Sequence, residues 1–155
     1  MALALAEAPS WRGEGVDISP TSVNWARALA EAAGTSDRAN IHEGDALSFR
    51  PQCPAQAAIS CFVLEHLEKP EALLGNMAEA LEPGAPAFVT AAITAAEIDH
   101  IYEFRRESEL VALAEQAGFR VCASYSAAPE RRLPGRRFLP RSMGLVLERR
   151  HGEFW

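Results

Sequence analysis

The sequence lacks the features that mark several classes of protein. Its three cysteines, Cys53, Cys61 and Cys122, form no C-x-x-C pair, so neither a disulfide framework nor a structural zinc site is expected. No stretch approaches the ~18 apolar residues of a membrane span. The balance of 15 basic against 21 acidic residues gives a net charge of -6, which argues against a nucleic-acid-binding surface. We therefore expect a cytoplasmic protein whose partner is a small molecule, with neither nucleic acid nor membrane involved.

No glycine-rich loop precedes the first predicted strand. That strand covers residues 13–18 and carries an acid, Asp17, near its end, whereas the alanine- and leucine-rich residues 1–8 predict a short helix. In open α/β sheets a glycine-rich turn after the first strand receives a nucleotide cofactor, and an acid at the tip of the second strand binds its ribose hydroxyls. Asp17 fits the second role, and nothing in the sequence fills the first.

Predicted strands and helices alternate along the rest of the chain, which indicates an α/β fold with a mainly parallel sheet. Ser19 as N-cap, Pro20 at the first helical position and Gly34 as a stop predict the first long helix. The other predicted elements are strands at 39–43, 57–63, 85–93, 119–125 and 143–149, a helix at 70–81, and a helix capped by Ser108 that stops at Gly118. The length of 155 residues predicts a single domain, 1–155.

Six short motifs occur in an order that resembles the class I S-adenosylmethionine-dependent methyltransferases. They are Gly15–Pro20, Glu43–Ala46, Val63–Leu67, Leu81–Gly84, Asp99–Ile101 and Ala117–Phe119. The leucine-glutamate-histidine run at 64–66 makes the resemblance closest to small-molecule enzymes of the ubiquinone-biosynthesis type. The resemblance implies a Rossmann-like sheet of seven strands, mainly parallel with an antiparallel last strand, and S-adenosylmethionine as the cofactor.

The resemblance also implies roles for single residues. Asp17, with Ile18 beside it, would bind the cofactor ribose, and Asp45 would contact the adenine amino group, with the backbone of Ala46 next to it. Cys61 takes the position at the tip of the fourth strand, where the backbone lies near the cofactor. Each acid also has a simpler interpretation, because Asp17 can cap the following helix and Asp45 can stabilise a Gly-Asp turn.

The departure from the family is at the N-terminus. The first strand and its glycine-rich loop are missing, so the resemblance implies an N-terminally truncated domain. That strand lies in the middle of the sheet, and its loss would leave backbone groups of two neighbouring strands unpaired. A homo-oligomer or a complementing chain is therefore a possible partner.

Two histidines are the catalytic candidates. His66 follows a buried strand where ligands bind in such sheets, and His100 lies where the family contacts its substrate. Either could remove a proton from an acceptor, with Glu65, Asp99 and Tyr102 as substrate contacts. The alternatives are that His66 only packs and that methyl transfer needs only positioning of the acceptor. No metal site is expected, because the four histidines show no H-x-x-x-H or H-x-H spacing.

An arginine-rich loop can be a solvated segment or a clamp for an anionic acceptor, and its members are Arg131, Arg132, Arg136, Arg137 and Arg141.

The favoured function is methyl transfer from S-adenosylmethionine to oxygen or nitrogen of a small molecule. The alternative is a catalytically inactive methyltransferase-like fragment, or a partner subunit that completes its sheet with another chain. A nicotinamide oxidoreductase is disfavoured, because the chain lacks a G-x-G-x-x-G loop.

Overall fold

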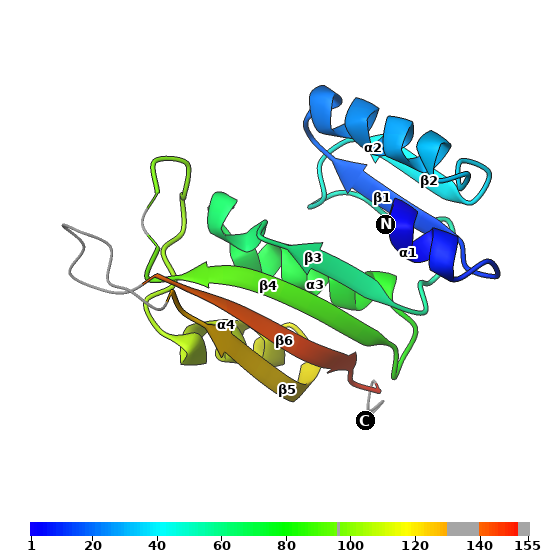
Figure 1. Cartoon of the computed structure of the whole chain (residues 1–155). Helices are drawn as coiled ribbons and strands as arrows, with labels where there is room; N and C mark the ends of the chain where they lie inside the picture. Colours follow the sequence, from blue (N-terminus) through cyan, green and yellow to red (C-terminus); the bar gives the residue numbers. More distant parts are fainter. Residues whose placement is uncertain (96, 130–139, 152–155) are drawn as a thin grey trace. The chain divides into compact units, whose positions relative to one another are not determined.

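The computed structural model describes residues 1–95, 97–129 and 140–151, and these form two compact units divided after Pro51. Figure 1 shows the order of the helices and strands along the chain. None of the helices in the described ranges is both long enough and apolar enough to span a membrane. The expectation of a single domain over 1–155 stays a prediction.

The first unit consists of two helices and a two-stranded parallel sheet. Its elements are α1 (Ala2–Glu7), β1 (Gly13–Asp17), α2 (Pro20–Ala32) and β2 (Ala39–Glu43). The predicted helix start is confirmed, because the Ser19 hydroxyl accepts a hydrogen bond from the backbone N–H of Ser22. The predicted stop is also confirmed, since Gly34 follows α2 with φ +65°.

A small apolar core holds this unit together. Val23 and Ala30 of α2 pack with Ile41 of β2, and all three are buried. The side chain of Met1 lies so close to β1 that a Cβ atom on Gly13 would approach its sulfur to 2.7 Å. Glycine at this position therefore allows the start of the chain to lie against the strand.

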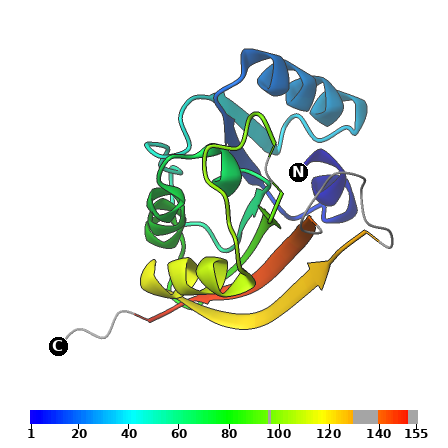
Figure 2. The ribbon, with the colours of Figure 1, turned by 90° about the vertical axis from the view of Figure 1, so that its left-hand side faces the viewer.

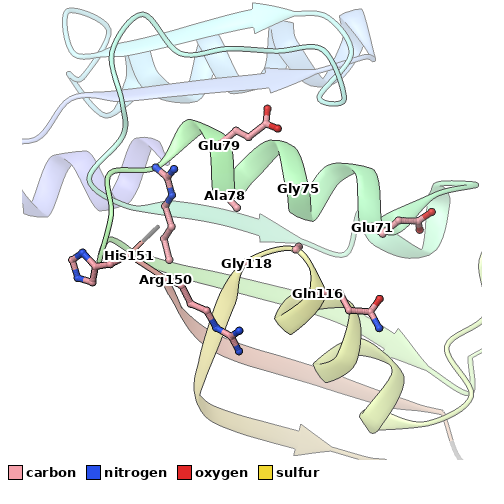
Figure 3. Close-up of a pocket in the computed structure, with 10 residues that line it drawn as sticks. Glu71, Gly75, Ala78, Glu79, Gln116, Gly118, Arg150 and His151 are labelled. Carbon is pink, nitrogen blue, oxygen red and sulfur yellow. The ribbon is translucent and has the colours of Figure 1, made fainter. Parts of the chain in front are cut away.

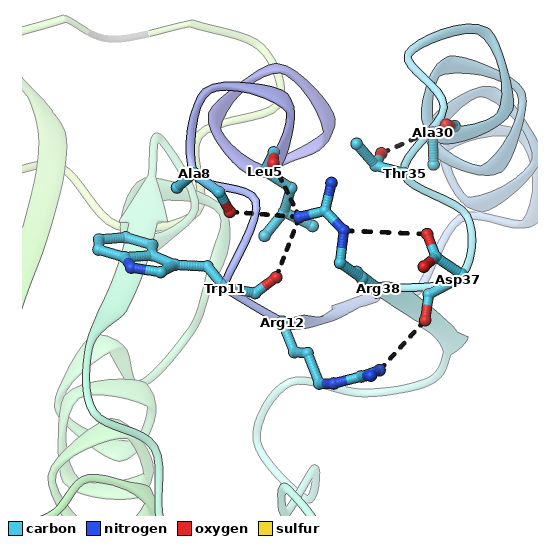
Figure 4. Close-up of polar contacts among 8 residues, drawn as sticks. All are labelled: Leu5, Ala8, Trp11, Arg12, Ala30, Thr35, Asp37 and Arg38. Atoms are coloured by element: carbon cyan, nitrogen blue, oxygen red, sulfur yellow. Dashed lines mark hydrogen bonds and ion pairs between the residues drawn. The ribbon is translucent and has the colours of Figure 1, made fainter.

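Arg38 fixes the end of α1 (Figure 4). Its Nη1 donates to the carbonyl oxygens of Leu5 at 2.8 Å and of Ala8 and Trp11 at 3.2 Å each. Carbonyl groups in the last turn of a helix have no partner within the helix, and a guanidinium also complements the negative end of the helix dipole. This one side chain therefore attaches the short helix α1 to the segment that leads into β2.

The second unit is a four-stranded mixed sheet in the order β3-β4-β6-β5. Its strands are β3 (Ala58–Cys61), β4 (Pro86–Ile93), β5 (Phe119–Ala127) and β6 (Arg141–Arg149). β3 pairs with β4 in parallel, and β6 runs antiparallel to both β4 and β5. The predicted antiparallel last strand is therefore confirmed, whereas the single continuous sheet of the family is here described as two separate sheets.

Helices α3 (Pro70–Ala80) and α4 (Glu107–Gln116) contact each other and lie on one face of this sheet (Figure 2). The alternation along β4 follows from this arrangement, since Ala87, Val89, Ala91 and Ile93 are buried while the residues between them are more exposed. The predicted cap of α4 is wrong. The helix begins at Glu107, and the carboxylate of Glu109 accepts a hydrogen bond from the backbone N–H of Arg105.

Four strands, β1, β2, β3 and β5, each have one edge without a ladder partner among the described residues. β1 pairs only with β2, and β3 pairs only with β4. By the family resemblance, β1 and β3 are the two strands that would flank the family's first strand. Every sheet has edge strands, so the expectation that two neighbours lost a partner stays a prediction.

Candidate functional site

In the first unit, Asp17 and Asp45 lie at the same edge of the sheet. β1 and β2 are parallel, with Asp17 opposite Glu43, so the carboxyl ends of both strands meet. The backbone N–H of Gly44 donates to the carbonyl oxygen of Asp17 at 3.0 Å. Asp45 directly follows Gly44, so both acids follow the strands where open α/β sheets bind their ligands.

The carboxylate of Asp17 is held by the turn into α2. Its Oδ1 accepts a hydrogen bond of 2.8 Å from the backbone N–H of Ser19. No described residue donates to Oδ2, and the side chain is exposed. Ile18 beside it is 75% exposed, which leaves an apolar surface next to the acid. The turn therefore orients Asp17 without using all of its acceptor capacity.

Asp45 is arranged in the same way. Its Oδ1 accepts a hydrogen bond of 2.8 Å from the backbone N–H of Leu47, and its carbonyl oxygen accepts one from Phe49 at 3.0 Å. The side chain is exposed, and Ala46 is half-buried. Both acids thus stabilise turns, as the simpler interpretation expects, and both keep an oxygen facing no described donor.

In the second unit, the carboxyl ends of the parallel strands carry unusual backbone. Exposed Cys61 ends β3, and Phe62 follows it with φ 53°. Thr94, which follows β4, has the same φ of 53°. These are the two non-glycine residues with positive φ in the described parts of the chain, and such strained residues cluster at functional sites. Sequence reasoning missed both, because neither phenylalanine nor threonine signals this conformation.

The backbone N–H of Phe62 is held by Thr90. It donates to both the carbonyl oxygen and the Oγ1 of Thr90, each at 3.1 Å. These bonds offset part of the strain at Phe62 and fix the end of β3 against β4. The position of Cys61 is therefore well defined, although no residue in the described ranges gives its thiol a partner base.

Glu65 joins three segments of the second unit. It lies in a short 3-10 helix, η1 (Leu64–His66), and is 1% exposed. Its Oε1 accepts a hydrogen bond of 3.2 Å from the backbone N–H of Ala92 in β4. Its carbonyl oxygen accepts two bonds of 2.9 Å, from the N–H groups of Ile101 and Tyr102. Glu65 therefore fixes the loop after β4 against η1.

The two candidate imidazoles meet beside Glu65. The ring centroids of His66 and His100 are 5.1 Å apart, with the rings at 80° to each other. His66 Nδ1 lies 2.9 Å from the carbonyl oxygen of Asp99, and His100 Nδ1 contacts the carbonyl oxygen of Ala95. A carbonyl oxygen only accepts, so Nδ1 carries the proton in both rings. In the neutral imidazoles the Nε2 lone pairs are then free to accept a proton or bind a ligand.

The structure thus gathers the residues predicted from the sequence into two groups, one in each unit. Asp17, Ile18, Asp45 and Ala46 form the first group, and Glu65, His66, Asp99 and His100 form the second. Tyr102 is half-buried and its ring lies 4.7 Å from that of Phe104, so its side chain is used in packing. Of the arginine-rich loop, Arg131, Arg132, Arg136 and Arg137 lie outside the described residues, and Arg141 pairs with Glu107 at 3.0 Å.

A separate hollow of about 600 Å³ opens between α3, α4 and the end of β6 (Figure 3). Charged and polar side chains line it together with neighbouring alanine and glycine residues, and the larger ones are Glu71, Glu79, Gln116, Arg149, Arg150 and His151. Arg149 bonds to the backbone of Ala85, just before β4 begins, so the hollow lies at the amino end of that strand. None of the predicted site residues lines it, and we assign it no part in the site.

Comparison with protein families supplies a context for this geometry. The model of the methyltransferase domain family matches residues 1–84, which is more than half of the chain. No curated protein matches the chain at a significant level.

Solved structures share the fold at low sequence identity. The [4+2]-cyclase SpnF matches with a TM-score of 0.81 and 16% identity, over 97% of this chain and 71% of that one. The mitomycin 7-O-methyltransferase MmcR matches with a TM-score of 0.73 and 24% identity, over 96% of this chain and 45% of that one. An S-adenosylmethionine-dependent methyltransferase from Methanosarcina mazei matches with a TM-score of 0.68 and 16% identity, over 97% and 87% of the two chains. Since one of these proteins is a cyclase, the shared fold does not by itself fix the reaction.

Proposed function

The chain belongs to the class I S-adenosylmethionine-dependent methyltransferases, and we propose that it transfers a methyl group to oxygen or nitrogen of a small-molecule acceptor. The observation that carries the proposal is the pair of exposed carboxylates, Asp17 and Asp45, at the carboxyl edge of β1 and β2. When bound, the cofactor supplies a methyl group on a positively charged sulfur.

The first unit fits the adenosine part of this cofactor. In the oriented carboxylate of Asp17, Oδ2 faces no described donor and Oδ1 keeps a second lone pair, so the two oxygens can each accept a hydrogen bond from one ribose hydroxyl. Exposed Ile18 offers an apolar surface to the adenine ring, and Asp45 can accept from the adenine amino group beside the backbone of Ala46. The backbone of Cys61, at the end of β3 in the second unit, stays a prediction as a cofactor contact.

The second unit supplies the groups for the acceptor. His66 and His100 each hold an Nε2 lone pair ready to take a proton from an acceptor hydroxyl or amine. Glu65 and Asp99 are then substrate contacts, together with the backbone at Tyr102. Alignment of the acceptor alone is the alternative, since positioning removes much of the barrier for a good nucleophile.

A second candidate is a non-catalytic module that completes its sheet with another chain or a second copy. The unpaired edges of β1 and β3 favour it, because exposed edges attract pairing partners. Size-exclusion chromatography with light scattering tests this version, and a stable, folded monomer would contradict it.

Calorimetric titration of the full chain with S-adenosylhomocysteine tests the main proposal. We expect saturable binding to one site, followed by transfer of radiolabelled methyl groups to a panel of small hydroxyl and amine acceptors. A folded chain that binds no S-adenosylhomocysteine would refute the proposal. Binding without transfer to any acceptor would favour the non-catalytic candidate.

A further inference from the structure

Glu65, His66 and His100 form a cluster of metal-ligating groups in the second unit. Each offers one ligand atom, and the three atoms lie within 4.8 Å of one another. We propose that this cluster binds a divalent transition-metal cation of the Zn²⁺ type. The inference goes beyond methyl transfer and does not depend on it.

The buried carboxylate of Glu65 is the observation that points to a cation. Its Oε1 is satisfied by the N–H of Ala92, but Oε2 is buried and has no hydrogen-bond partner among the described residues. A buried polar group without a partner is costly, and the cost is larger for a charged group. A cation bound to Oε2 would remove this cost, whereas packing alone leaves it in place.

The histidines are already oriented as metal ligands. Imidazoles that bind metals almost always donate the other ring N–H to a carbonyl oxygen or a carboxylate, which fixes the tautomer. His66 has this arrangement with the carbonyl of Asp99, and His100 has it with the carbonyl of Ala95. The carboxylate of Asp99, 3.8 Å from His66 Nδ1, adds negative charge beside the first of them.

The donor set decides which class of metal fits. Two imidazoles and one carboxylate suit zinc, iron and nearby metals, whereas Mg²⁺ and Ca²⁺ prefer oxygen ligands alone. Three protein ligands also leave a coordination position open for water or another small ligand. Tetrahedral ligands about 2.0–2.1 Å from zinc lie roughly 3.4 Å apart. Binding therefore requires the three ligand atoms to move closer together than in this structure.

Loop folding explains why sequence spacing does not predict this site. His66 and His100 are far apart in sequence, and the contacts of Glu65 with Ile101 and Tyr102 bring them together. A nitrogen bound to metal cannot also take a proton. The metal therefore excludes the general-base role of the same ring while it is bound.

The test is calorimetric titration of the full chain with ZnCl₂ after treatment with EDTA. We expect one zinc per chain, and we expect His100→Ala and Glu65→Gln each to weaken binding by at least ~100-fold, because even second-shell changes cost 10–100-fold. His151→Ala is the matched control, since it removes an exposed histidine outside the cluster and should leave the affinity unchanged. Circular dichroism checks that each variant is folded. If Glu65→Gln unfolds, the zinc affinity of His100→Ala tests the site alone, because this variant changes a half-buried loop residue.

Cobalt substitution separates this site from adventitious binding at the three exposed cysteines. We expect the absorption spectrum of bound Co²⁺ to lack a thiolate charge-transfer band. The metal site is overturned if zinc binds His100→Ala as tightly as wild type, if no zinc binds, or if the cobalt spectrum shows thiolate ligation. S-adenosylhomocysteine titration of the same samples reports on the methyltransferase proposal separately. A chain that binds the nucleoside but not zinc refutes only the metal site.

Discussion

Replacement of Asp17 by asparagine tests a single oxygen of its carboxylate. Oδ1 accepts the N–H of Ser19 at 2.8 Å, and an asparagine can keep this bond with its carbonyl oxygen. The other oxygen becomes an NH₂ group, which cannot accept from a ribose hydroxyl. A hydrogen bond to a charged group contributes about 1.5–3 kcal/mol. We take the lower value because Asp17 is exposed and water competes for it.

The expected loss for Asp17→Asn is therefore about tenfold in affinity for S-adenosylhomocysteine, since ~1.4 kcal/mol corresponds to a factor of ten. Asp17→Ala removes both oxygens and should cost about 100-fold, because two such bonds contribute about 3 kcal/mol. Asp37→Asn is the control, as this exposed acid of the same unit lies before β2 begins rather than after it ends.

Isothermal titration calorimetry measures the affinities, and thermal melting followed by circular dichroism shows whether each variant is folded. Folded Asp17→Ala with an affinity within threefold of wild type would refute the assignment of Asp17. An equal loss in Asp37→Asn would point instead to general electrostatic attraction.

Three further changes test other parts of the structure. Asp45→Asn should weaken S-adenosylhomocysteine binding by about tenfold while leaving the turn to Leu47 intact, and the same titration checks it. Phe62→Gly should be more stable than Phe62→Ala by about 1 kcal/mol in urea denaturation, because only glycine adopts φ 53° without strain. If Phe62→Ala were the more stable variant, the backbone at residue 62 would not be strained. Arg38→Ala should lower the free energy of unfolding by roughly 2–4 kcal/mol in the same urea denaturation, since the two N–H groups of Nη1 serve three carbonyl oxygens. Arg38→Lys should lose only about half as much, and equal losses in the two variants would show that the hydrogen bonds of Nη1 do not stabilise the fold.

Local signals in the sequence predicted most of the secondary structure. Ser19, Pro20 and Gly34 mark the limits of α2 because capping and positive φ are properties of single residues and their neighbours. Ser108 failed as a cap because Arg106 already has extended backbone and Glu109 reaches back to the preceding N–H. The strand predicted over 57–63 ends at Cys61, because the backbone turns at Phe62 in a conformation that its side chain disfavours.

The candidate site was predicted residue by residue but not as an arrangement. Asp17 and Asp45 could be paired in advance, because parallel strands bring their carboxyl ends to one edge. The meeting of Glu65, His66 and His100 could not, because it depends on hydrogen bonds from the loop after β4 to one carbonyl oxygen. The buried, unpartnered Oε2 of Glu65 is likewise a product of tertiary structure, with no signature in spacing or composition.

The direction of the strands, rather than the presence of a hollow, indicates which surface of this protein to test first. The hollow lined by Glu71, Glu79 and Arg150 has a volume of about 600 Å³, but it lies at the amino end of β4. Both groups of candidate residues follow the carboxyl ends of parallel strands, in the first unit after β1 and β2 and in the second after β3 and β4. Ligands of open α/β sheets bind at those ends, because the loops that follow the strands can vary without disturbing the sheet. Substitutions in the hollow should therefore leave nucleoside and zinc binding unchanged, and a loss of either would show that strand direction had misled the assignment.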